Sequence, residues 1–80
     1  MRKVDVKKSF GVAVRARRKE LQLSQEELAE RAGLHRTYVS DVERGSRNVS
    51  LENIARLANA LEVSVAALFP PAELDRSTQG

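Results

Sequence analysis

The sequence has no cysteine, and its only two prolines are the adjacent pair Pro70 and Pro71. The lack of cysteine excludes a disulfide framework and a thiolate metal site, and it fits a reducing cytosol. No apolar run is long enough for a membrane span or for the core of a signal peptide, although residues 1–8 are rich in Lys and Arg. We therefore expect a cytoplasmic protein with no membrane partner.

The chain also lacks the residue groupings that catalysis needs. Eighty residues form one small domain, which leaves no room for an enzyme built from two lobes. No combination of nucleophile, base and orienting acid stands out. His35 is the sole histidine, and with no cysteine in the chain it does not form a metal site. We expect no enzymatic activity, no cofactor and no metal.

Charge is distributed unevenly along the chain, whose net charge is +3 and whose pI is about 9.8. Residues 1–20 hold eight Lys or Arg against two acids, whereas residues 51–80 hold two Arg against four acids. A basic end suits a polyanionic partner such as nucleic acid, but a charged first helix is as often a solvated face. Charge alone leaves both interpretations open.

Residues that typically begin or end helices divide the chain into separate helical segments. Ser24 and Glu27 form a capping box, in which each side chain accepts from the other residue's backbone amide. Gly33 and Gly45 fall where a helix can end in the left-handed conformation that glycine adopts at no steric cost. Gly11 is expected to weaken the first helix by up to ~1 kcal/mol relative to alanine.

Apolar residues recur at helical spacing, and no strand pattern is evident. The clearest period lies after the cap Ser50, where Leu51, Ile54, Leu57, Ala58 and Leu61 are predicted to face inward. We predict an all-α fold of five helices in one domain, residues 1–71, followed by a disordered tail, residues 72–80. The helices are expected at about 6–21, after Ser24, at 36–44, after Ser50 and at 65–69.

The second and third of these helices fit a helix-turn-helix frame that begins at Gln25. Ala29 and Gly33 are small enough for two helices to meet at a steep angle. The apolar set that would lock the angle is Leu28, Ala32, Leu34, Val39 and Val42. A helical hairpin in any small bundle would reproduce part of this pattern. A short polar second helix flanked by basic residues favours DNA binding.

From Arg15 to Phe69 the sequence resembles the Cro/C1-type repressor domain, also called the XRE family. The motif LSQEELAERAG followed by VERG carries the resemblance. It implies a compact five-helix DNA-binding fold that normally acts as a dimer. Gln22 is a departure, because relatives often carry glycine there, and it implies a slightly different turn.

Within that family, the string HRTYVSDVERGSRN and the small size resemble the controller proteins of restriction-modification systems. Stand-alone phage-type repressors share much of the string. The resemblance implies binding to paired symmetric operators upstream of the protein's own gene, with activation at low occupancy and repression at high. The partners expected are double-stranded DNA, a second copy of the chain and, as a further candidate, RNA polymerase.

Base contacts are expected from the start of the third helix onward. Arg36 has the planar fork that reads guanine O6 and N7, worth ~1 to 3 kcal/mol of discrimination, and Thr37 lies beside it. Asp41 could accept from cytosine N4, but pairing with Arg44 or Arg36 in its own helix is an equal alternative. The expected base contacts are Arg36, Thr37, Ser40, Asp41 and Arg47.

Contacts to the DNA backbone are expected on either side of that helix. The free amides and dipole at the start of the second helix favour a phosphate near Ser24 and Gln25. Arg47 could serve phosphate instead of bases. The resemblance implies that Tyr38 contacts the sugar-phosphate backbone of DNA or packs on a thymine methyl. The alternative is that Tyr38 is half-buried against the second helix. The expected backbone contacts are Ser24, Gln25, His35, Tyr38, Ser46 and Asn48.

Two further groups are expected to have structural roles: an ion pair implied by the resemblance, and the apolar residues left over near the C-terminal end. In the family, an arginine of the first helix pairs with the glutamate near the end of the recognition helix, which corresponds to Arg18 and Glu43 here. A dimer on DNA needs recognition helices ~34 Å apart. The expected interface is the edge of the fourth helix with Val63, Val65, Leu68 and Phe69, although Leu68 and Phe69 could instead close the core.

A second class of function remains open, because the same helices could hold a protein instead of DNA. The chain would then be an interaction module such as an antitoxin or an adaptor. Strong binding to random DNA without preference for any genomic site would favour this alternative.

Overall fold

The computed structural model describes residues 5–69, so the predicted tail 72–80 lies outside the described residues. Within this range there is no strand, and the all-α prediction is confirmed. No helix of residues 5–69 combines the length and apolarity needed to cross a bilayer. The elements are α1 (Val6–Glu20), α2 (Gln25–Ala32), α3 (Arg36–Arg44), α4 (Leu51–Ala60) and the 3-10 helix η1 (Val65–Leu68).

The fifth predicted helix is therefore a 3-10 helix of four residues, which leaves four α-helices in the described chain. The residue before it, Ser64, is its cap, and the Ser64 side chain accepts from the amide of Ala67. A segment this short forms one tight turn, for which the 3-10 geometry is common.

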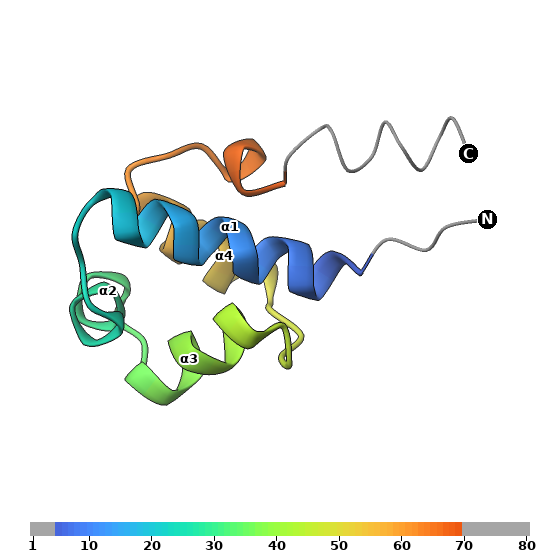
Figure 1. Ribbon diagram of the computed structural model, residues 1–80, viewed down its shortest axis with the longest axis horizontal. Coiled ribbons are helices and arrows are strands. Elements are labelled where there is room, and N and C mark those ends of the chain that lie inside the picture. The colour runs from blue at the N-terminus through green and yellow to red at the C-terminus, as the bar shows by residue number, and fades with distance from the viewer. Residues whose placement is uncertain (1–4, 70–80) are drawn as a thin grey trace.

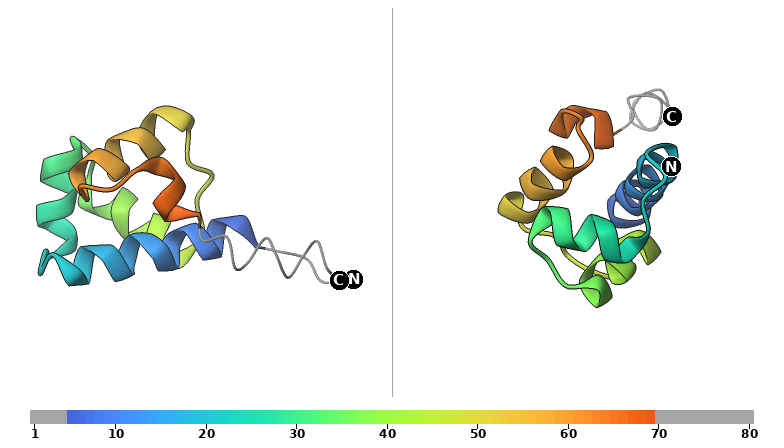
Figure 2. Two further views of the ribbon diagram at one scale, coloured as in Figure 1. Left: turned by 90° about the horizontal axis from the view of Figure 1, so that it is seen from above. Right: turned by 90° about the vertical axis from the view of Figure 1, so that its left-hand side faces the viewer.

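The helices surround one core with α1 along its length. Figure 1 shows α3 on one side of α1 and η1 on the other, and Figure 2 shows the same arrangement from above and from the end. α1 packs against α3 and η1, while α2 packs against α3 and α4. The buried core consists of Phe10, Val14, Leu28, Ala29, Ala32, Val39, Val42, Leu57, Ala58, Ala60, Leu61 and Leu68.

Side-chain caps begin every described helix except α3. Asp5, Ser24, Ser50 and Ser64 each accept from the backbone amide three residues later. α3 follows His35, which makes no side-chain capping bond. Such a cap typically contributes about 1 kcal/mol, so α3 depends more than its neighbours on tertiary packing.

Left-handed backbone marks three of the connections near the site. Gly33 and Gly45 end α2 and α3 at φ 71° and 75°, as predicted. Gln22, in the turn between α1 and α2, has φ 59°. A side chain is strained in this conformation and glycine is not, so the structure gives a physical reason to expect glycine at this position.

Gly11 has a role that helix propensity did not reveal. A Cβ added there would lie 2.4 Å from the carbonyl oxygen of Val42 and 2.7 Å from that of Glu43. Both obstacles are backbone atoms, which cannot rotate away. Glycine is therefore needed where α1 and α3 come closest.

Leu51 corrects the predicted inner face of α4. Its side chain is 86% exposed, whereas Leu57, Ala58 and Leu61 are buried and Ile54 is half-buried. A helical period gives the direction in which a side chain points but not how far the neighbouring elements extend. Leu51 is the first residue of α4, at the end of the stripe, and it faces solvent.

The C-terminal apolar residues divide between core and surface. Leu68 is only 1% exposed, so it serves the core of its own chain and offers no surface to a second copy. The ring of Phe69 stacks on that of Phe10, with centroids 5.2 Å apart. Val63 is half-buried and Val65 is 44% exposed. For Leu68, the alternative role of closing the core is thus the one observed.

Candidate nucleic-acid interface

The turn between α2 and α3 holds the two helices at a fixed angle. Two bonds close the end of α2: the amide of Gly33 donates to the carbonyl of Glu30 at 3.3 Å, and that of Leu34 donates to Ala29 at 2.9 Å. The side chains at the junction of the helices, Leu28 and Val39, are fully buried. The predicted helix-turn-helix is therefore present, and its packing decides which face of α3 points outward.

The outward face of α3 is polar along its whole length. Arg36, Thr37 and Arg44 are exposed, and Ser40 and Asp41 are half-buried. The loop that follows adds further exposed polar side chains. None of these residues belongs to the core, so the structure gathers the predicted base-contacting set on one surface: Arg36, Thr37, Ser40, Asp41 and Arg47.

Asp41 is paired with two arginines of this surface. One carboxylate oxygen accepts from Nη2 of Arg44 and the other from Nη2 of Arg47, the latter at 2.8 Å. Arg44 also donates to Oγ of Ser40 at 2.7 Å. The hydrogen bond from Arg47, with the nearby charge of Arg44, holds the pKa of Asp41 below its usual value. The intrahelical pairing with Arg44 is thus observed, and Arg47 is a partner that the sequence did not indicate.

Tyr38 is half-buried and has partners on two sides. Nδ2 of Asn53 in α4 donates to its hydroxyl oxygen at 3.1 Å. The guanidinium carbon of Arg47 lies 4.8 Å from the ring centroid, a cation–π distance. The role of Asn53 was not predictable from the sequence, because a polar residue beside the apolar stripe of α4 resembles any solvated position.

The start of α2 confirms the capping box. The amide of Glu27 donates to Oγ of Ser24 at 3.0 Å, and the amide of Ser24 donates to Oε1 of Glu27 at 2.8 Å. These bonds lower the pKa of the Glu27 carboxyl. Gln25, a predicted backbone contact, donates through Nε2 to Oε1 of Glu43 at 3.0 Å. Part of the Gln25 amide is thus engaged inside the protein.

Arg18 and Glu43 form the predicted ion pair between α1 and α3. The pair is bidentate, with Nε to Oε2 at 2.6 Å and Nη2 to Oε1 at 3.0 Å. Only 11% of the Arg18 side chain and 4% of the Glu43 side chain are exposed. Arg18 also donates to the carbonyl of Leu23 at 2.8 Å, and the hydrogen bonds to Glu43 raise its pKa. This arginine ties α1, α3 and the turn before α2 together.

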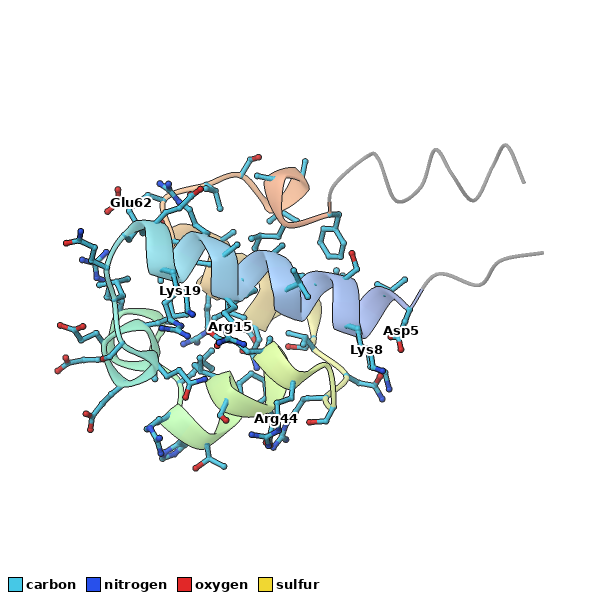
Figure 3. All side chains as sticks on the ribbon, in the orientation of Figure 1. Asp5, Lys8, Arg15, Lys19, Arg44 and Glu62 are labelled. Atoms are coloured by element: carbon cyan, nitrogen blue, oxygen red, sulfur yellow. The ribbon has the colours of Figure 1, made fainter. Side chains whose placement is uncertain are left out.

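Positive charge extends from α3 onto α1. Figure 3 shows Lys8, Arg15 and Lys19 spaced along α1 and Arg44 on α3. All four side chains are exposed. The polar face of α3 therefore lies in a basic region of the surface, which favours a polyanionic ligand.

Comparison with known proteins supports the same family. A family model described as helix-turn-helix matches residues 14–68. The control protein C.SmaI of Serratia marcescens is 49% identical over 66 residues, which are 82% of this chain and 79% of the relative. The control protein C.BamHI of Bacillus amyloliquefaciens is 54% identical over 55 residues, 68% of each chain.

A solved structure agrees with the fold. The crystal structure of the restriction-modification controller protein C.AhdI from Aeromonas hydrophila superposes with a TM-score of 0.76 at 52% sequence identity. The match covers 78% of this chain and 94% of the other. The chain therefore belongs to the XRE-type helix-turn-helix family, and restriction-modification controller proteins are among its relatives.

Proposed function

We propose that the protein is a sequence-specific DNA-binding transcription regulator that places α3 in the major groove. The observation that carries the proposal is the outward face of α3, where exposed Arg36, Thr37 and Arg44 are held by a buried helix-turn-helix junction. A helix fits the major groove, where each base pair presents its own pattern of donors and acceptors. The family assignment likewise points to DNA binding and not to catalysis.

Arg36 and Thr37 are the proposed leading base contacts, since the first residues of a recognition helix reach base edges first. Ser40 and Asp41 follow one turn later. Asp41 has both carboxylate oxygens engaged by arginines, so its main role in the free protein is to hold Arg44 and Arg47 in place. Arg47 is then available to base edges or phosphate once DNA competes for it.

Phosphate contacts are proposed on both sides of α3. Ser24, Gln25 and His35 lie at the starts of α2 and α3, and Ser46 and Asn48 lie in the loop after α3. Tyr38 is proposed as a further backbone contact. Such contacts set register and orientation and carry little sequence information.

A homodimer on a symmetric operator is part of the proposal. One recognition helix reads half a site, and two half-sites lie about one DNA turn apart. The large apolar side chains exposed on α4 and η1 are Leu51, at 86%, and Val65, at 44%. Val63 and Phe69, on either side of η1, are half-buried. These four side chains are proposed to face a second copy. Replacing Leu51 with Glu should lower the dimer fraction in sedimentation, and its thermal midpoint should match that of the wild type at concentrations where both are monomeric.

The regulatory context proposed is a restriction-modification operon in the cytoplasm. C.SmaI and C.BamHI are control proteins, and C.AhdI is a restriction-modification controller protein. An immunity repressor of Bacillus phage phi105 is also 39% identical, although this chain spans only 49% of it, so a stand-alone phage-type repressor is the second candidate. Activation would require RNA polymerase as a further partner.

Protection mapping of the DNA upstream of the protein's own gene tests the proposal. A controller should protect two symmetric half-sites there, whereas a phage-type repressor should protect sites near phage genes. Within the protected site, Arg36→Ala should lose discrimination at one position and Asn48→Ala should weaken all sequences alike. Equal binding of wild type to the upstream region and to random duplex at moderate salt would count against the proposal and favour a protein-interaction module.

A further inference from the structure

A hydrogen bond joins the recognition helix to the first turn of α4. Nδ2 of Asn53 donates to the hydroxyl oxygen of Tyr38 at 3.1 Å, and both side chains are half-buried. The backbone amide of Asn53 donates to the cap Ser50 at 3.1 Å, which fixes its position in the first turn of α4. Asn53 is therefore held from its backbone side while its amide group points at Tyr38.

The direction of this bond determines what the Tyr38 hydroxyl can do next. A phenol has one O–H donor and an oxygen that accepts. Asn53 supplies a proton to the oxygen, so the phenol's own proton is left for another acceptor. Phosphate oxygens of DNA accept and do not donate. Accepting a bond also polarises the O–H group and strengthens it as a donor.

The ring of Tyr38, whose hydroxyl is bonded to Asn53, also contacts a side chain of the proposed DNA-binding surface. Arg47 lies over the ring at 4.8 Å and donates to Asp41 at 2.8 Å. Asp41 in turn accepts from Arg44. Holding the ring in one orientation therefore gives Arg47 a fixed platform at the edge of the proposed DNA-binding surface.

We propose that Asn53 is a positioning residue for DNA binding, which orients Tyr38 so that its hydroxyl donates to a backbone phosphate and its ring supports Arg47. The inference rests on the proposed function, because it needs α3 to face DNA. It adds a residue of α4 that does not touch DNA itself. Since the contact is to phosphate, its loss weakens binding to all sequences alike.

A double-mutant cycle measures the coupling between the two side chains. The probe is a duplex that the wild-type chain selects from a random-sequence library, with an unselected duplex of the same length beside it. Tyr38→Phe should weaken binding about tenfold and Asn53→Ala about threefold, since one hydrogen bond is involved. The double variant should bind about tenfold more weakly, because without the hydroxyl the amide has nothing to position. Asn59→Ala, an exposed asparagine of the same helix, should bind like wild type.

Asn53→Asp provides a second test in which the fold is retained. A carboxylate is similar in size to the amide of Asn53, and in the first turn of α4 it interacts favourably with the helix dipole. It can only accept, so the Tyr38 proton would turn toward it and be lost to phosphate. Binding should fall about tenfold, the strength of one such bond, and most of this loss should disappear in the Tyr38→Phe background. A loss from charge repulsion would persist there and would change the dependence on salt.

The outcomes separate this inference from the proposed function. If wild type selects no duplex, the proposed function fails and the inference fails with it. If wild type binds and Tyr38→Phe is neutral, the hydroxyl contact is absent and the inference alone is overturned. If Asn53→Ala and Tyr38→Phe weaken binding by amounts that multiply, Asn53 acts independently and the inference is again overturned. Coupled losses with unchanged thermal midpoints support it.

Discussion

Two acidic residues of α3, two positions apart, have opposite surroundings. Glu43 points inward, is 4% exposed and is bound by Arg18 and Gln25. Asp41 points outward, is 20% exposed and is bound by Arg44 and Arg47. Both carboxylates accept hydrogen bonds from basic or amide side chains, but only that of Glu43 is shielded from solvent.

The difference shows how burial assigns roles to similar chemistry. A buried ion pair is costly to break, because one charge is then left without a partner or water. An exposed pair contributes about 0 to 1 kcal/mol, because water and salt screen it. We therefore expect Glu43 to govern stability and Asp41 to govern what Arg44 and Arg47 do toward a ligand.

Glu43→Ala is expected to give the largest effect on stability. It leaves Arg18 partly buried and uncompensated, so the free energy of unfolding should fall by about 3 to 5 kcal/mol. Urea unfolding followed by circular dichroism measures it. Arg18→Met combined with Glu43→Leu should recover much of the loss, since apolar replacement removes both charges. A loss below about 1 kcal/mol would place Glu43 in the same class as Asp41.

Gly11→Ala tests the close approach that lets Arg18 reach Glu43. The added methyl group would meet the carbonyls of Val42 and Glu43, so α3 must move away from α1. The expected loss is about 1 to 3 kcal/mol, even though alanine favours the helix. Ala16→Gly in the exposed part of α1 is the control, with a loss of about 1 kcal/mol from propensity alone. Stabilisation by Gly11→Ala would show that the two helices can separate freely.

Asp41→Asn should leave the stability of the fold nearly unchanged, because water and salt screen the exposed pairs of Asp41. It should, however, release the guanidinium groups of Arg44 and Arg47 and remove a negative charge that faces phosphate. Binding to random duplex should therefore rise roughly three- to tenfold and depend more steeply on salt. Fluorescence anisotropy at several salt concentrations measures both. Unchanged binding to random duplex together with lost binding to one operator position would instead identify Asp41 as a base contact.

The smallest effect is expected in the pH dependence of folding. The pKa of Asp41 is lower in the folded chain than its usual value of 3.8, chiefly because Arg47 donates to it. Its contribution is therefore complete above about pH 4 and is lost as the pH falls through the lower folded pKa. The difference in thermal midpoint between wild type and Asp41→Asn should be constant above pH 5 and shrink toward pH 2. A difference that persists at the lowest pH would mean that the charge of Asp41 is not its source.

Local signals predicted most of the fold. The capping box at Ser24 and the glycines at 33 and 45 set the ends of α2 and α3 as observed, because caps and left-handed stops depend on a few adjacent residues. Arg18 and Glu43 were paired through the family resemblance. The helical period alone places Arg36, Thr37, Ser40 and Asp41 on one face, whereas Arg47 lies in the loop after α3 and joins that face through its bond to Asp41. The contact of these residues with DNA stays a prediction.

Features that depend on distant segments were not predictable. Gly11 looked like a weak point because the backbone of α3 that approaches it lies some thirty residues away in the sequence. Leu51 was expected in the core because the helical period gives the direction of its side chain. The period does not show that the neighbouring elements end before they can cover it. The bond from Asn53 to Tyr38 could not be predicted, since a single hydrogen bond between α3 and α4 produces no repeating pattern in the sequence.

The stacking of Phe10 on Phe69 also has a kinetic consequence. It joins one end of the described chain to the other, and contacts so far apart in sequence require the largest loop to close. We expect η1 to dock after the helix-turn-helix has formed, and to leave first when the protein unfolds. Weakening this stack would then shorten the lifetime of the native state while leaving the folding rate nearly unchanged.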